Sequence, residues 1–98
     1  MKIAVSVNED KKLSMHFGRS KQMSIYSVEG DKISFLESRD VPSGLQSHNF
    51  SFLTDCEAVI SGSIGPSMQE MLLSEGIKPY IYQETDDPIA AIGRLLGI

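Results

Sequence analysis

Alternating apolar and polar positions in the first third of the chain predict β-strands. Residues 2–7 alternate in this way and include β-branched side chains, which is typical of a strand. Residues 23–28 and 32–37 lie on either side of the turn sequence Glu29-Gly30-Asp31. Because a glycine beside an aspartate supplies the positive φ of a tight reversal, these two segments are predicted to form a β-hairpin.

After the hairpin, a segment with apolar residues at helical spacing is followed by short apolar runs that indicate strands. Residues 45–54 bring Leu45, Phe52 and Leu53 close to one helical face, so a first helix is expected there. Residues 57–61 and 77–82 are short apolar runs, which are typical of strands.

Two further helices are predicted from the signals at their ends. Pro66 suits a first helical turn, where its missing N–H costs nothing, and Gly76 lies where that helix should end. Asp87 and Pro88 form an N-cap and first-turn pair for the last helix. The expected inner stripes are Met68, Met71 and Leu72 in the first of these helices and Ile89, Ile92 and Leu96 in the second.

The resulting element order, β-β-β-α-β-α-β-α, indicates a single α/β domain over residues 1–98. The opening strand and the hairpin should pair antiparallel, whereas the later β-α-β units must cross over right-handed and pair parallel. A mixed five-stranded sheet in the strand order 3-2-1-4-5, flanked by helices in three layers, satisfies these rules. This is the topology of ribonuclease-H-like folds.

Composition excludes several classes of function. The net charge is −4 and the basic residues are scattered, so the footprint of a nucleic-acid-binding protein is missing. No apolar run approaches the roughly 20 residues of a membrane span. The apolar run at residues 3–5 is too short for the core of a signal peptide, so we expect a cytoplasmic protein.

The most informative segment is the connection at residues 14–20, Ser-Met-His-Phe-Gly-Arg-Ser. A loop that pivots on Gly18 can present the imidazole of His16 and the guanidinium of Arg19 together. Imidazole ligates borderline metals and guanidinium binds anions, although either residue can also be an ordinary surface group. We expect Phe17 to anchor the loop in the core, and Met15 to fill space or assist a soft metal.

A second loop at residues 62–66, Gly-Ser-Ile-Gly-Pro, follows the fourth predicted strand. It ends at a helix N-terminus, where free N–H groups and the helix dipole favour an anion. The alternative is that the two glycines only make a tight turn and bind no ligand, because their spacing matches no nucleotide-binding fingerprint. In the predicted strand order both loops follow adjacent strands, and ligands of open α/β sheets bind in such crevices.

The remaining candidates have mainly structural interpretations. Cys56 is the single cysteine, which excludes an internal disulfide, and free cysteines are usually buried. His48 is expected at the surface. A nuclease of this topology needs an acidic residue on the first strand, where Ser6 stands, and no serine- or cysteine-hydrolase motif is present. The chain is therefore not expected to be an enzyme.

Over nearly its whole length the chain resembles the dinitrogenase iron–molybdenum cofactor-binding family, which includes NifX and the C-terminal part of NifB. The most specific feature is the combination of His16-Phe17-Gly18-Arg19 with the Gly-Ser-Ile-Gly-Pro block at residues 62–66, in this order and at this separation. The resemblance also covers residues 1–5, 14–15, 26–28, 55–60 and 72–77.

This resemblance implies a ribonuclease-H-like fold without nuclease activity, and binding of an iron–sulfur-type cluster such as the iron–molybdenum cofactor or a precursor. It implies that His16 contacts the cofactor, and we expect this residue to be the metal ligand. A negatively charged cluster would be stabilised by Arg19 and by the N–H groups after Ile64, so Gly18, Arg19, Ile64 and Gly65 are expected to contact it. The chain departs from many relatives in two ways. Ser20 stands where they have a cysteine, and the segment at residues 42–48 is shorter than their glycine- and histidine-rich one.

The leading hypothesis is a non-enzymatic carrier or scaffold for such a cluster, with cofactor-biosynthesis proteins as partners. One alternative is a regulatory domain that binds a small anion or metabolite in the same crevice without metal. Another is an interaction module without a ligand, for which the acidic segment at residues 84–87 could serve as a contact face.

Overall fold

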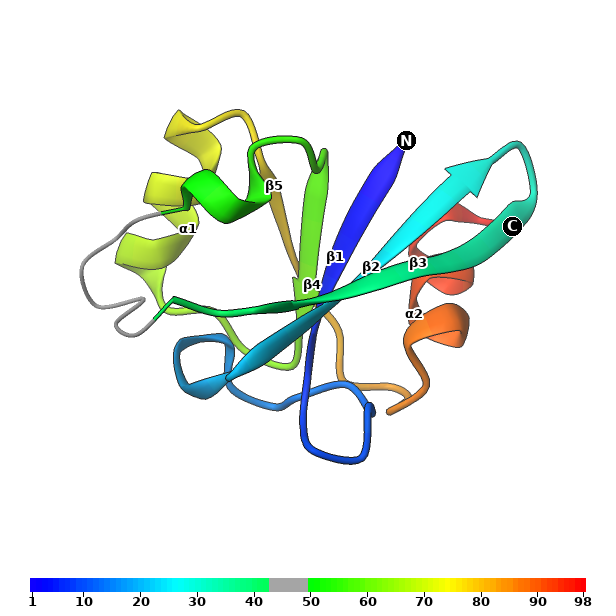
Figure 1. The fold of residues 1–98 in the computed structure, drawn as a ribbon, viewed down its shortest axis with the longest axis horizontal. Coiled ribbons are helices and arrows are strands. Elements are labelled where there is room, and N and C mark those ends of the chain that lie inside the picture. Colours follow the sequence, from blue (N-terminus) through cyan, green and yellow to red (C-terminus); the bar gives the residue numbers. More distant parts are fainter. Residues whose placement is uncertain (43–49) are drawn as a thin grey trace.

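The computed structural model describes residues 1–42 and 50–98, and they form a mixed five-stranded sheet in the order β3-β2-β1-β4-β5 (Figure 1). The central strand β1 pairs antiparallel with β2 and parallel with β4. At the two edges, β3 pairs antiparallel with β2, and β5 pairs parallel with β4. The predicted α/β class and strand order are confirmed. The strands are β1 (Lys2–Val7), β2 (Gln22–Glu29), β3 (Lys32–Asp40), β4 (Ala58–Ser61) and β5 (Lys78–Ile81).

The predicted hairpin joins β2 and β3 through a tight turn. Gly30 adopts a φ of 62°, and Glu29 lies opposite Lys32 in the register. A register shift between Ile25 and Tyr26 marks a bulge in this pair of strands. Strand β3 continues to Asp40, three residues beyond the predicted end.

Two α-helices cover opposite faces of the sheet (Figure 1). Helix α1 (Pro66–Ser74) packs on the face that carries Ala4, and α2 (Pro88–Leu96) packs on the face that carries Val5. The opposite placement follows from β1, in which successive side chains point to alternate faces. The Asp87 carboxylate accepts from the Ile89 N–H at 3.2 Å, as its N-cap position predicts.

Two details of the predicted helices are wrong. Of the helix expected at 45–54, residues 45–49 lie outside the described part, and residues 50–54 contain only a 3-10 helix, Ser51–Leu53. In α2, Ile89 was expected inside but is 45% exposed. Ile92 is buried as predicted, and Pro88, Ala91 and Gly93 are buried with it. Pro88, Ala91 and Ile92 share one helical face at spacings of three and four.

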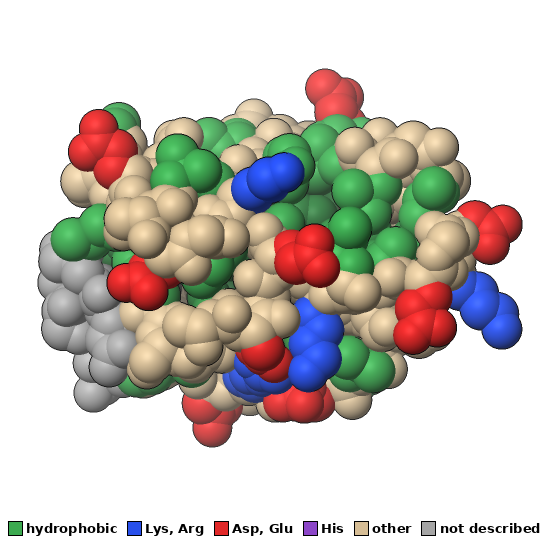
Figure 2. Space-filling view, turned by 90° about the horizontal axis from the view of Figure 1, so that it is seen from above, with side chains coloured by type: hydrophobic (Ala, Val, Ile, Leu, Met, Phe, Trp, Pro, Cys, Tyr) green, Lys and Arg blue, Asp and Glu red, His purple; other side chains and the backbone are tan. Residues whose placement is uncertain are grey.

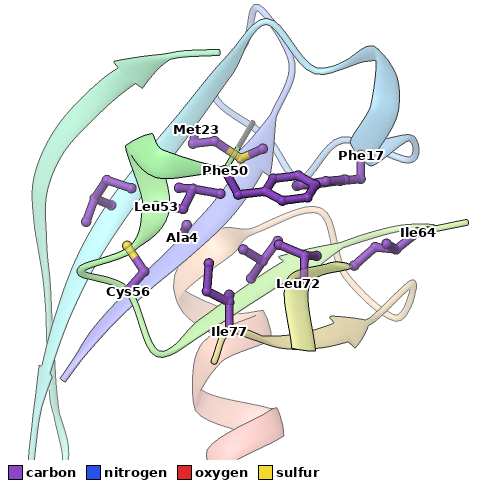
Figure 3. Packing of buried hydrophobic residues seen from close by; sticks show 11 residues of the cluster. Ala4, Phe17, Met23, Phe50, Leu53, Cys56, Ile64, Leu72 and Ile77 are labelled. Carbon is purple, nitrogen blue, oxygen red and sulfur yellow. The ribbon is translucent and has the colours of Figure 1, made fainter. Parts of the chain in front are cut away.

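The larger buried cluster joins the sheet, α1 and both loop regions (Figure 3). Phe17 and Phe50 lie with ring centroids 6.2 Å apart, beside Met23. Cys56 is buried in the same cluster as a free thiol, in agreement with its expected structural position. The cluster thus ties the segment after β1 to the segment before β4.

The end of the molecule at which β1 begins is seen in Figure 2. Apolar side chains gather there over part of the surface, and acidic and basic side chains are interspersed among them. The described residues contain no helix with the length and hydropathy of a membrane span.

Candidate functional site

The candidate site lies where β1 and β4 end side by side, at the lower edge in Figure 1. Beyond β1 the chain turns through Lys11, with a φ of 62°, and returns so that Leu13 pairs with Val7. The Ser14 N–H then donates to the Ser6 carbonyl at 2.8 Å. This return brings the connection at residues 14–20 across the end of β1 toward β4.

The two predicted loops are joined by hydrogen bonds. The Gly62 N–H donates to the Ser14 carbonyl at 2.8 Å, and the Phe17 N–H donates to the Ser63 carbonyl at 3.0 Å. The Ser63 hydroxyl donates to the Met15 carbonyl at 2.7 Å. The expected juxtaposition of the loops is therefore present in the structure.

Gly62 permits this close approach. A Cβ atom at this position would lie 2.6 Å from the Cα of Met15 and 3.0 Å from the carbonyl oxygen of Ser14. Both atoms belong to the backbone, so no side-chain rotation could relieve the contact. The glycine is required for loop contact, which sequence spacing alone did not reveal.

His16 has a fixed backbone and an exposed imidazole. Its N–H donates to Ser14 Oγ at 3.2 Å, and its carbonyl accepts from Ser20 Oγ at 3.0 Å. The imidazole Nδ1 lies 3.4 Å from Ser63 Oγ. The side chain is thus presented to solvent from a backbone with defined partners, as a ligand-binding residue requires.

Phe17 anchors the loop, as predicted, because its side chain is only 1% exposed. It begins a 3-10 helix, Phe17–Arg19, after which the Ser20 N–H donates to the Phe17 carbonyl at 3.2 Å. Gly18 is exposed and does not adopt a positive φ. The pivot role expected for Gly18 is therefore wrong, and the turn is made by ordinary 3-10 geometry.

Arg19 faces a neighbouring cleft of about 510 Å³. Lys21 also lines this cleft, as do the acidic residues Glu9 and Asp40. Among the described residues, no carboxylate lies within ion-pair distance of Arg19. His16 does not line this cleft, so the structure places the imidazole and the guanidinium on adjoining surfaces of one loop.

Ile64 and Gly65 contribute backbone groups to the site. The Ile64 side chain is buried in the core, and its carbonyl accepts from Gln69 Nε2 at 2.8 Å. Gly65 is the N-cap of α1 and supplies no capping side chain. Within the described residues, the N–H groups of Ile64, Gly65, Ser67 and Met68 have no acceptor. These donors and the helix dipole favour an anion.

The site holds few metal donors. Residues 1–42 and 50–98 contain no group of three or more His, Cys, Asp or Glu side chains arranged to hold a metal ion. Burial, reinforced by the Asp55 charge, raises the pKa of the Cys56 thiol to about 11, which disfavours its thiolate. Cys56 precedes β4, whereas the site follows it. His48 lies outside the described residues.

The profile of the family described as dinitrogenase iron-molybdenum cofactor matches residues 1–97. The chain belongs to this family. Membership confirms the resemblance identified from the His-Phe-Gly-Arg and Gly-Ser-Ile-Gly-Pro blocks. No match was found among curated proteins.

Solved structures share the fold of this family member. The protein PH0822 is 25% identical, with a TM-score of 0.79 over 99% of this chain and 91% of its own. The apo form of the orange protein from Desulfovibrio gigas is 20% identical, with a TM-score of 0.70 over 98% and 88% of the two chains. The Thermotoga protein TM1290, named as a candidate NifB protein, is 20% identical, with a TM-score of 0.60 over the same shares.

Two residues of the site were missed by sequence reasoning about side-chain chemistry. Gly62 and Ser63 were treated only as parts of a loop, yet they make the contacts with residues 14–17. The available signal was their position directly after a strand predicted to lie beside β1. Reading those positions as contact residues would have required the register of β1 and β4.

Proposed function

We propose that this chain is a non-enzymatic carrier or scaffold for an iron–sulfur-type cluster, such as the iron–molybdenum cofactor or a precursor. The observation that carries the proposal is the exposed imidazole of His16, next to the loop at the start of α1 whose N–H groups have no acceptor among residues 1–42 and 50–98. An imidazole can ligate iron, and the N–H groups favour the negative charge of a cluster.

The sparse donor set suits a carrier. A protein that encloses a cluster with four ligands stabilises it strongly, whereas a carrier must also release its cargo. Here His16 supplies one borderline ligand, and the thioether of Met15, 50% exposed, lies next to it in the chain. Arg19 adds positive charge on the adjoining surface of the loop. In this proposal the cluster is the cargo. Cofactor-biosynthesis proteins in the cytoplasm deliver the cluster to the carrier and receive it from the carrier.

The test is anaerobic reconstitution with Fe²⁺ and sulfide, with and without molybdate. Charge-transfer absorbance and bound metal are measured for the wild type, His16→Ala and His48→Ala, the last as the matched control. We expect a stoichiometric signal in the wild type and the control, and its loss in His16→Ala. Retained binding in His16→Ala would contradict the role of His16, and no signal in any protein would contradict the carrier.

One observation favours a second candidate function, the binding of a small anion without metal. Arg19 and Lys21 line the cleft of about 510 Å³, and Arg19 has no ion-pair partner among the described residues. This function predicts that inorganic phosphate raises the melting temperature in an Arg19-dependent manner. It also predicts that Fe²⁺ has no effect, which separates it from the carrier.

A further inference from the structure

The hydroxyl group of Ser63 has two neighbours and only one proton. Its Oγ lies 2.7 Å from the Met15 carbonyl oxygen and 3.4 Å from Nδ1 of His16. A carbonyl oxygen can only accept a hydrogen bond, whereas a neutral imidazole nitrogen can donate or accept. The short contact with Met15 therefore takes the hydroxyl proton, and Ser63 turns its lone pairs toward His16.

A lone pair facing Nδ1 favours a proton on that nitrogen. A neutral imidazole carries one N–H, so a proton on Nδ1 leaves Nε2 with its lone pair available. We propose that Ser63 is a positioning residue that selects the Nδ1–H tautomer of His16 and thereby makes Nε2 the free donor atom. The consequence for cargo rests on the carrier function proposed above, whereas the tautomer itself does not.

The surrounding backbone holds this geometry in place. The Ser63 carbonyl accepts from the N–H of Phe17, and the neighbouring Gly62 N–H donates to the Ser14 carbonyl. Phe17 is buried, so the backbone contact between residues 62–63 and 14–17 is anchored in the core. Ser63 Oγ is the only partner of the His16 ring among the described residues. The fold therefore holds the backbones of Ser63 and of residues 14–17 side by side, with the hydroxyl 3.4 Å from the ring nitrogen.

The arrangement resembles a general feature of metal-binding histidines. The ring nitrogen that does not face the metal usually donates to a nearby acceptor, which fixes the tautomer and the ring orientation. Carboxylates and backbone carbonyls are the common acceptors in that role. Here a serine hydroxyl can act as the acceptor because a backbone carbonyl already uses its proton.

The test is the tautomer of His16 in the metal-free protein. Long-range ¹H–¹⁵N spectra are recorded at about pH 9, above the range in which imidazoles titrate, because protonated and unprotonated ring nitrogens resonate far apart. A His48→Gln background leaves His16 as the single histidine. The variants are Ser63→Ala, which removes the hydroxyl, Ser63→Thr, which keeps it, and Ser34→Ala as an exposed serine control on β3.

We expect the Nδ1–H tautomer to predominate in the wild-type site, in Ser63→Thr and in Ser34→Ala. Ser63→Ala should shift the population toward Nε2–H, which free histidine side chains prefer. A predominance of Nε2–H in the unsubstituted site would overturn the proposal without any variant, so it does not depend on whether Ser63→Ala folds. A tautomer unchanged in a folded Ser63→Ala protein would overturn it as well.

A second measurement links the tautomer to cargo. After anaerobic reconstitution with Fe²⁺ and sulfide, Ser63→Ala should lose iron to a chelator about 10- to 100-fold more readily than the wild type, and Ser63→Thr should resemble the wild type. If the wild type binds no iron–sulfur species, the carrier function fails while the tautomer result still supports the role of Ser63. Equal iron retention in Ser63→Ala and the wild type would overturn the positioning role.

Discussion

Arg39 and Asp55 form a two-point ion pair that ties the edge strand β3 to the turn before β4. Nη1 of Arg39 lies 2.6 Å from Oδ1 of Asp55, and Nη2 lies 2.7 Å from Oδ2. The guanidinium also donates to the Phe52 carbonyl at 2.8 Å and to a Glu37 carboxylate oxygen at 2.9 Å. The hydrogen bonds from Arg39, with a further one from Lys2, hold the pKa of Asp55 well below its usual range.

The ion pair predicts a pH-dependent loss of stability in Asp55→Asn. A carboxyl with a lowered pKa stabilises the folded state above its unfolded pKa, near 3.8, and this contribution is lost as the pH falls. Because the Asp55 side chain is 42% exposed, we expect a cost of only about 1 kcal/mol at pH 7. The difference from wild type should shrink progressively below about pH 4 in urea unfolding.

Glu37→Gln is the matched control for this experiment. Glu37 is more exposed and makes a single hydrogen bond to Arg39, so its replacement should cost less than that of Asp55. An Asp55→Asn cost that stays the same at pH 7 and pH 2 would contradict the ion-pair explanation.

Cys56 is predicted to be unreactive in the folded protein. The thiolate is the nucleophilic form, and burial raises the pKa of this thiol to about 11. Iodoacetamide at pH 8 should therefore label the urea-unfolded chain readily and the native chain only at the rate of unfolding. Equal labelling rates in the two states would contradict the buried position.

The same thiol predicts a decline of stability at alkaline pH. A raised folded-state pKa means that its contribution is intact below the unfolded value, near 9, and falls as the pH rises toward 11. Urea unfolding of the wild type and of Cys56→Ala over this range should show a steeper decline in the wild type. Parallel curves would show that this thiol does not produce the decline.

Gly62→Ala is predicted to separate the two loops. The added Cβ would lie 2.6 Å from the Cα of Met15, so the backbone must shift, at a cost of about 1–3 kcal/mol. Thermal unfolding measures the cost, and iron retention after reconstitution measures the effect on the site. Gly65→Ala is the control for stability, because a Cβ there meets no atom within 4 Å. Equal melting temperatures for the two variants would refute the steric argument.

Phe17→Ala is predicted to destabilise the fold and release the His16 loop. Removing a fully buried phenylalanine costs about 3–5 kcal/mol, and here it also removes the contact with Phe50. Urea unfolding should show the loss of stability. Hydrogen exchange should be faster at the backbone amides next to the hydrogen bond between the Phe17 N–H and the Ser63 carbonyl. Phe35→Ala should cost far less, since that side chain is 54% exposed. Similar costs for both variants would be inconsistent with an anchoring role.

Local patterns were sufficient to predict most of the fold. Alternation marks β1 and β2, Gly30 marks the hairpin turn, and Asp87 marks the start of α2. The 3-10 helix Ser51–Leu53 was not predicted, because Phe52 and Leu53 fit a helical stripe while their packing depends on Phe17 and Phe50. Three-residue turns give too few positions for periodicity to be decisive.

The site was predictable as a meeting of two loops but not as a set of contacts. Strand order places His16 near residues 62–66, and the hydrogen bonds confirm that neighbourhood. Which glycine matters depends on interatomic distance: Gly62 allows backbone contact, whereas Gly18 faces open space. Such distances depend on the register of β1 with β4. The spacing of residues within either loop carries no information about that register.

The contacts of the Ser63 hydroxyl with Met15 and His16 join residues 48 and 47 positions apart. A nascent chain that has emerged only as far as the hairpin already carries the imidazole, but it lacks the partner strand and the second loop. Under the proposed carrier function, recognition of cargo through both loops would require a chain whose synthesis has passed α1 and whose β1 and β4 have paired. Occupancy by cargo would then report that the central strands of an individual molecule have paired, which is a form of quality control without any additional factor.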